Sequence, residues 1–210
     1  MTYEITQPRL APRRSYGRIA AIVVLGWLAL TFLMRDPLHY LIDPTPESFG
    51  RYWPNRPWLV AHIVGGVAAL VLGPFQLSTR LRTRYPAIHR AMGRAYLVGV
   101  LIAGATAFYL APFAPQASFG VALAALGAAW WITAGIALAA IRRRRIAVHR
   151  RWMIRSYIVT FAFVTFRLFG TLPLWAPFGV HGEAVAAWLA WMLPMLAFEL
   201  YRRSPVRATR

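Results

Sequence analysis

The sequence contains no cysteine and no lysine, and only six of its 210 residues are aspartate or glutamate. The absence of cysteine excludes disulfides, thiolate metal sites and cysteine nucleophiles. Carboxylates are so scarce that no acidic pair lies within an apolar segment. We also find no nucleophile–base–acid set and no glycine-rich phosphate loop. An ordinary hydrolytic enzyme is therefore the class that the sequence supports least.

Long apolar segments are abundant instead. Hydrophobic residues make up 59% of the chain and charged residues only 14%, against about a quarter charged in soluble domains. Six apolar windows approach the roughly 20 residues that a bilayer-spanning helix needs. They cover residues 19–34, 58–77, 95–112, 119–141, 156–174 and 184–201. The sequence thus predicts an all-α fold, a polytopic transmembrane bundle of about six helices.

Positive charge alternates between the two sides of these windows. The N-terminal tail, the loops after the second and fourth windows, and the C-terminal tail hold most of the arginines. The opposite connections hold only Arg35, Arg51 and Arg56. The positive-inside rule then places both termini in the cytoplasm. We predict basic cytoplasmic tails at 1–17 and 202–210 around a six-helix domain at 18–201, in the bacterial inner membrane.

The net charge of +18 could suggest nucleic-acid binding. We reject nucleic acid as a partner, because the basic residues lie between apolar windows and not along the face of a soluble fold. The arginine run at 142–145 instead predicts contact with anionic lipid head groups. The expected partners are the lipid bilayer and those head groups, and a membrane protein partner or a homo-oligomer is left open.

The pattern R-x-M-x-R-x-Y occurs twice, from Arg90 and from Arg151, with an offset of 61 residues. A histidine stands just upstream of each copy, His89 and His149. The offset equals two windows and their loops, so the pattern favours a parallel internal repeat of helix hairpins.

Polar residues inside a bilayer are costly and therefore candidates for function. Arg167 lies twelve residues beyond Arg155, roughly 18 Å further along a helix. We expect it to be buried in the bundle or to face an outer vestibule, and to need a bound anionic or polar partner, because no carboxylate is evident at its depth. Helical spacing puts it on one stripe that could line a cavity, hold a cofactor or relay protons. The stripe comprises His149, Met153, Ser156, Thr160, Val164, Arg167 and Thr171.

A second stripe runs along the window at 58–77. Its members are His62, Gly66, Ala69, Gly73 and Gln76. Small residues between the two polar ends would let another helix, or a flat ligand, approach closely.

Two segments, "AHIVGGVAALVLGPFQLSTRLRTRYPAIHRAMGRAYL" and "HRRWMIRSYIVTFAFVTFRL", resemble the predicted-membrane-protein family called domain of unknown function 2306. The resemblance covers residues 62–168. It is carried by His62, by Gly-Pro-Phe-Gln at 73–76, by two His-Arg pairs and by Arg167. It implies a multi-helix bacterial membrane protein. The architecture is also similar to di-haem cytochromes of the b561 type and to bacterial cytochrome b subunits, although Gln76 stands where a helix of those proteins would have its second histidine.

Three interpretations of function follow. In the first, His89 and His149 ligate a metal or haem b, or His62 ligates haem with an outer partner. Arg155 or Arg167 would then neutralise the propionates, and electrons would pass to or from a quinone or a partner protein. In the second, the protein transports or senses a small anion or a lipid through Arg167. In the third, it is an accessory or assembly subunit of a larger membrane complex.

Overall fold

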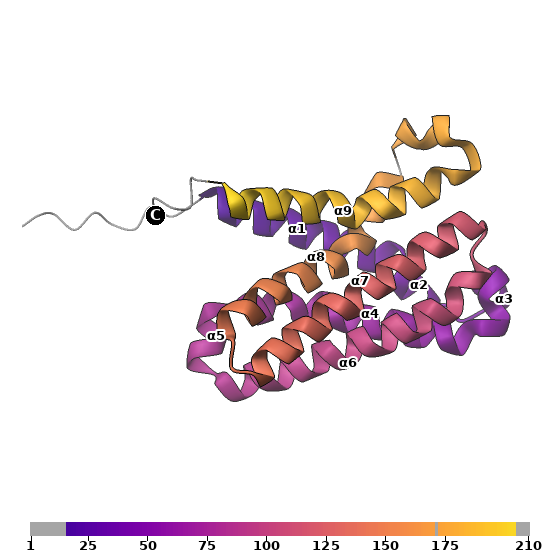
Figure 1. Cartoon of the computed structure of the whole chain (residues 1–210). Coiled ribbons are helices and arrows are strands. Elements are labelled where there is room, and N and C mark those ends of the chain that lie inside the picture. Colours follow the sequence, from indigo (N-terminus) through magenta and orange to yellow (C-terminus); the bar gives the residue numbers. More distant parts are fainter. Residues whose placement is uncertain (1–15, 171, 205–210) are drawn as a thin grey trace, which may run out of the picture.

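The computed structural model describes residues 16–170 and 172–204, and nearly all of them are helical (Figure 1). The described residues contain no strand. The long helices are α1 (Tyr16–Arg35), α4 (Arg56–Leu77), α6 (Pro86–Leu110), α7 (Ala117–Arg142), α8 (Ile146–Gly170) and α9 (Gly182–Arg203). The shorter elements are α2 (Pro37–Ile42), α3 (Pro46–Phe49), η1 (Gly50–Asn55), α5 (Thr79–Arg84), η2 (Ala111–Phe113) and η3 (Pro173–His181). The predicted all-α bundle is confirmed; most of the two predicted basic tails lies outside the described residues.

Five stretches of the described chain are long and apolar enough to cross a membrane. They are Ala20–Ile42, Pro46–Leu77, Pro86–Phe113, Ala117–Arg142 and Pro173–Arg203. The remaining long helix, α8, is absent from this set because its arginines lower its hydropathy. With 25 residues it is nevertheless about 38 Å long, enough to span a bilayer. It packs against α7 and α9 inside the bundle.

The basic segments gather at one end of the bundle, as the alternation of charge predicts. We call this the basic end: it is formed by α5, the turn between α7 and α8, the start of α1 and the end of α9, at the left of Figure 1. The other end, here the cap end, is covered by α2, α3, η1, η2 and η3. The cytoplasmic location of the basic end and the identity of the membrane stay predictions.

Helices α6 and α8 begin about ten residues before the apolar windows predicted for them. Pro86 stands in the first turn of α6, where its missing N–H leaves no helical hydrogen bond unmade. The arginine-rich segments ahead of both windows are thus helical, so His89 and His149 lie in the first turn of α6 and of α8.

Helices α4 and α6 cross closely at Gly65 and Gly99. A Cβ atom added to Gly65 would lie 2.7 Å from the carbonyl oxygen of Gly99, and the reverse distance is also 2.7 Å. Both positions must therefore be glycine for the two backbones to meet. The neighbouring Gly66, which the sequence placed on a stripe of close approach, has open space beside it, with nothing within 4 Å of an added Cβ.

A buried hydrogen-bond network joins α6, α7 and α8. The Tyr96 hydroxyl lies 2.8 Å from Ser156 Oγ and 2.9 Å from Thr160 Oγ1, and Trp130 Nε1 donates to Thr160 Oγ1 at 2.8 Å. The Thr160 hydroxyl donates its proton to the Ser156 carbonyl, so it must accept the hydrogen bond from the Tyr96 hydroxyl. The Tyr96 hydroxyl then accepts from the Ser156 hydroxyl. Every polar group of the network is satisfied, as burial requires.

This network changes the interpretation of the two polar stripes. From Met153 to Thr160 the stripe on α8 is closed core and does not line a cavity, whereas Val164 borders a cavity described below. On α4, the Tyr157 ring occupies the space beside Gly73, and an added Cβ would overlap this ring. A flat ligand at Gly73 is therefore excluded in this arrangement. Thr171, the last member of the α8 stripe, lies outside the described residues.

The two copies of the repeated pattern occupy comparable places but have different contacts. Each stands at the start of the second helix of a hairpin, α4–α6 or α7–α8. Tyr96 reaches into α8, whereas Tyr157 donates to the Leu70 carbonyl of α4 at 3.2 Å. Arg94 is exposed, whereas Arg155 is mostly buried.

Candidate functional site

The first candidate site is the pair of histidines at the basic end. Gln76 is buried beside His89 and Gly93. In the amide orientation that satisfies both residues, its nitrogen donates to His89 Nδ1 and to the His89 carbonyl, each at 3.2 Å. The amide oxygen then accepts from the backbone N–H of Gly93 at 3.3 Å. Because Nδ1 of His89 accepts a hydrogen bond, a neutral ring carries its proton on Nε2.

The other two predicted ligands have the opposite tautomer. Nδ1 of His149 lies 2.9 Å from the carbonyl of Ala137, and Nδ1 of His62 lies 2.9 Å from the carbonyl of Ala103. A carbonyl only accepts, so Nδ1 donates in both cases, and in the neutral ring Nε2 keeps its lone pair. A metal-ligating histidine often has this tautomer, in which Nε2 binds the metal and Nδ1–H donates to a carbonyl that orients the ring.

These three histidines fall into two places. His149 is an electrostatic neighbour of His89, and both stand in the first turn of helices that begin at the basic end. His62 packs edge-on against Phe163, with ring centroids 5.7 Å apart. Phe163 lies fourteen residues beyond His149 on α8, a rise of about 21 Å. His62 therefore cannot share one metal with the other two.

The residues present do not form a bis-histidine haem site in this arrangement. His89 and His149 stand at the same end of the bundle, but the contact from Gln76 places the proton of a neutral His89 ring on Nε2, the nitrogen that would bind an iron. The described residues contain no cluster of three or more metal-ligating side chains. We derive no chemical step through a haem, and haem binding stays a prediction.

Arg155, predicted to neutralise a haem propionate, already has a carboxylate partner. Its Nε donates to Glu199 Oε1 on α9 at 2.8 Å, and its guanidinium lies 4.6 Å from the centre of the Trp152 ring. Glu199 also accepts from Arg202 of its own helix, at 3.4 Å. The charge of Arg155 serves to join α8 to α9.

Arg167 lies in the last turn of α8 and is partly exposed. Its side chain is 55% exposed, and its Nε lies 3.2 Å from Asp36 Oδ1. Of the two places expected for Arg167, burial in the bundle is wrong, whereas a position facing an outer vestibule agrees with the cavity that it lines. The expectation that no carboxylate lies at its depth is wrong. Asp36 stands at the corner between α1 and α2, where Pro37 prevents α1 from continuing. Asp36 and Arg167 are 131 residues apart in sequence, and only the packing of α1 on α8 brings them together.

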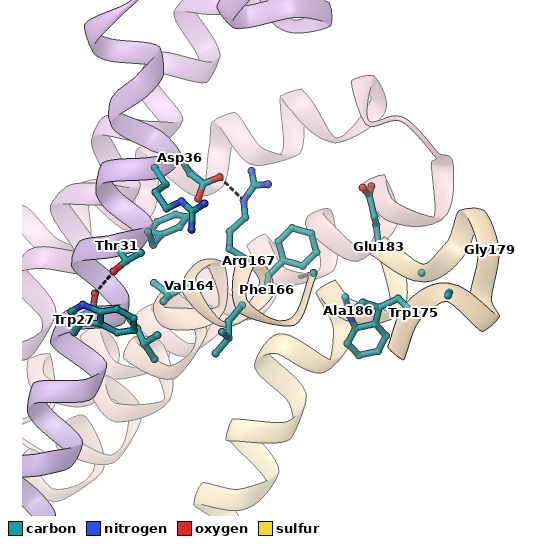
Figure 2. A pocket seen from close by; sticks show the side chains of 17 residues that line it. Trp27, Thr31, Asp36, Val164, Phe166, Arg167, Trp175, Gly179, Glu183 and Ala186 are labelled. Carbon is teal, nitrogen blue, oxygen red and sulfur yellow. Dashed lines mark hydrogen bonds and ion pairs between the residues drawn. The ribbon is translucent and has the colours of Figure 1, made fainter. Parts of the chain in front are cut away.

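The second candidate site surrounds this ion pair. A cavity of about 850 Å³ lies at the cap end between α1, α8, η3 and α9 (Figure 2). We call it the cap cavity. Its charged lining residues are Arg35, Asp36, Arg167 and Glu183, and its aromatic lining residues are Trp27, Phe32, Phe166 and Trp175. The volume lies in the range of small-molecule sites, roughly 300–1,000 Å³.

Two glycines shape the wall formed by η3 and α9. Gly179 has φ +52, a left-handed conformation that other residues rarely adopt. A Cβ on Gly182 would lie 2.9 Å from the carbonyl oxygen of Trp175. These positions let the chain fold back at the start of α9, which brings Trp175 and Glu183 into the lining.

Charges of both signs line the cap cavity. Figure 2 shows Asp36 on one side of Arg167 and Glu183 on the other, with Phe166 between Arg167 and Glu183. Within the described part of the chain, Arg35 and Glu183 make no ion pair, whereas Arg167 makes one, to Asp36. The sequence identified Arg167 but missed Asp36 and Glu183, because as loop carboxylates they carried no signal of a site.

Comparison with known proteins gives one match. A family model described as "Predicted membrane protein (DUF2306)" matches residues 59–201. No curated protein and no solved structure matches the chain.

Proposed function

The chain belongs to the DUF2306 family of predicted membrane proteins, and within that frame we propose that its cap cavity binds the phosphate-bearing head group of a membrane amphiphile. The observation that carries this proposal is the half-exposed guanidinium of Arg167 inside an 850 Å³ cavity. Arginine presents five N–H donors in a fork that matches phosphate oxygens. The ion pair with Asp36 uses Nε, which leaves the two Nη groups for a ligand.

Arg35 strengthens the case for an anionic group. It lines the same cavity from the end of α1. Two guanidinium groups converging on one space can hold a phosphate through several charge-assisted hydrogen bonds. Asp36 orients Arg167 without removing the positive character of this part of the cavity, because Arg35 remains unpaired within the described residues.

The location of the cavity supports an amphiphile over a free anion. The cap cavity lies at the ends of membrane-length helices, which is the depth of lipid head groups. One of its walls, α1, packs mainly on α2 and α8 and leaves Ile22, Val23 and Leu30 largely exposed. Apolar side chains beside a polar cavity suit a ligand that has a charged head and hydrocarbon tails.

The test is a binding titration on the full chain purified in a mild detergent. Isothermal calorimetry with short-chain phosphatidylglycerol should give saturable binding to the native protein. Arg167→Gln should weaken it about tenfold or more, since a charge-assisted hydrogen bond contributes about 1.5–3 kcal/mol.

A matched control is Arg56→Gln. Arg56 is an exposed arginine of the cap end that lies over Trp53, 4.5 Å from the ring centre, outside the cavity. Binding should survive this change. Equal binding by the native protein, Arg167→Gln and Arg56→Gln would sink the proposal, and so would the absence of saturable binding.

Haem b stays a second candidate for one reason: His62 and His149 both keep the Nε2 lone pair in the neutral ring. An absorption spectrum of protein expressed with added haem, recorded oxidised and dithionite-reduced, tests it. A Soret band lost in His149→Ala or His62→Ala would establish haem and identify the ligand. A visible spectrum without haem bands would contradict the redox interpretation.

A further inference from the structure

We infer that the cap cavity selects a zwitterionic head group, in which a phosphate is joined to a cationic nitrogen, and that Glu183 is the residue that recognises the nitrogen. This inference rests on the proposed function, because it extends the ligand that Arg167 would hold. It identifies a second contact point in the same cavity and the chemistry of the group that meets it.

The charge balance of the lining is the first argument. The cap cavity contains two arginines, Arg35 and Arg167, and two carboxylates, Asp36 and Glu183. Its formal charge is therefore zero, although charges of both signs are present. A ligand with net negative charge would meet repulsion from the carboxylates. A ligand with separated charges and no net charge complements the lining.

The arrangement of these charges is the second argument. Arg167 and Asp36 lie on one side of the Phe166 ring and Glu183 lies on the other (Figure 2). The positive and negative contact points are thus separated by an aromatic surface. A phosphate held by Arg167 would direct a short linker past Phe166 and its nitrogen toward Glu183.

Glu183 is free to act in this way. Its side chain is exposed, it lines the cavity, and it makes no ion pair within the described residues. It stands in the first turn of α9, where the helix dipole favours an ionised carboxylate.

Aromatic rings complete the recognition of a cation. Phe166 and Trp175 line the cavity on the side of Glu183 (Figure 2), and aromatic faces attract ammonium groups. A protonated primary amine would donate hydrogen bonds to Glu183. A quaternary ammonium would rely on the carboxylate charge and the rings alone. Both share the chemistry that we propose, and the experiment separates them.

The experiment compares three short-chain lipids on the full chain in the same detergent. They are phosphatidylethanolamine, phosphatidylcholine and phosphatidylglycerol, and the readout is the ratio of their affinities. The native protein should bind at least one zwitterionic lipid about two- to fivefold more tightly than phosphatidylglycerol, the contribution of one partly exposed ion pair. Glu183→Gln should abolish this preference while phosphatidylglycerol still binds.

Glu47→Gln is the matched control, since Glu47 is an exposed carboxylate of the cap end outside the cavity. It should keep the preference, and unchanged thermal unfolding of both variants would show that the fold is intact. A native protein without preference, or a preference that survives Glu183→Gln, overturns this inference while the proposed function stands. If no lipid binds the native protein, the proposed function itself has failed. A preference for ethanolamine over choline would assign hydrogen bonding as the dominant contact, and the reverse would assign the aromatic rings.

Discussion

Gly65 and Gly66 are neighbours on one helix, yet alanine should have opposite effects at the two positions. At Gly65 the new Cβ would lie 2.7 Å from the carbonyl oxygen of Gly99, 3.1 Å from the backbone nitrogen of Ala103 and 3.2 Å from its Cβ. These atoms belong to the backbone or to its first side-chain atom, so no flexible group can move aside. Helices α4 and α6 would have to separate by several tenths of an ångström. At Gly66 an added Cβ meets nothing within 4 Å.

The magnitude follows from a comparison of the two variants. Replacing glycine by alanine inside a helix gains about 1 kcal/mol of backbone propensity at either position, so this term cancels in the difference. The remaining term is overpacking at Gly65, which costs about 1–3 kcal/mol. For a chain of this size, 1 kcal/mol corresponds to about 2–4 °C in Tm. Gly65→Ala should therefore unfold several degrees below Gly66→Ala.

The assay is thermal unfolding of both variants and the native protein in one detergent, followed by circular dichroism. The Nδ1 contact of His62 with Ala103, one turn from Gly65, should lengthen as the helices separate. Gly99→Ala should reproduce the loss, because its Cβ would lie 2.7 Å from the Gly65 carbonyl oxygen. The close crossing is refuted if Gly65→Ala is as stable as Gly66→Ala.

Two further predictions concern the polar contacts of α8. Tyr96→Phe removes the hydroxyl that joins Ser156 to Thr160. It should lower the free energy of unfolding by about 1–3 kcal/mol, because the buried Ser156 hydroxyl loses its acceptor. Chemical denaturation measures this change, and an unchanged denaturation midpoint would contradict the network. Glu199→Gln leaves the mostly buried Arg155 without its carboxylate partner. This single variant should be less stable than the double variant Glu199→Gln/Arg155→Met, since a buried unpaired charge costs more than the loss of the whole ion pair. The ranking of their Tm values decides it, and a double variant less stable than Glu199→Gln would be evidence against the pair.

The candidate site was predictable only in part. Arg167 was recognised as a functional candidate because a charge after a long apolar run is conspicuous in sequence. Its partner was not recognised: Asp36 lies in a loop at the other end of the chain, and pairing across 131 residues depends on how α1 packs against α8. The predicted membrane depth left two places open for Arg167, the bundle interior and an outer vestibule. Because α8 ends at Gly170, Arg167 lies in its last turn, at the cap end.

Local features of the amino-acid sequence are enough to assign the class of this protein. Apolar length, the positions of the membrane-length segments and the concentration of arginine at one end are local properties, and each can be read without knowing which helices touch. The tertiary structure decided every pairwise contact. Helical periodicity gives the face on which a residue lies, but the rotation and crossing of the neighbouring helix decide what meets it. For that reason Gly65 packs against a backbone while Gly66 faces open space, and the stripe on α8 is closed core from Met153 to Thr160 before it reaches the cap cavity at Val164 and Arg167.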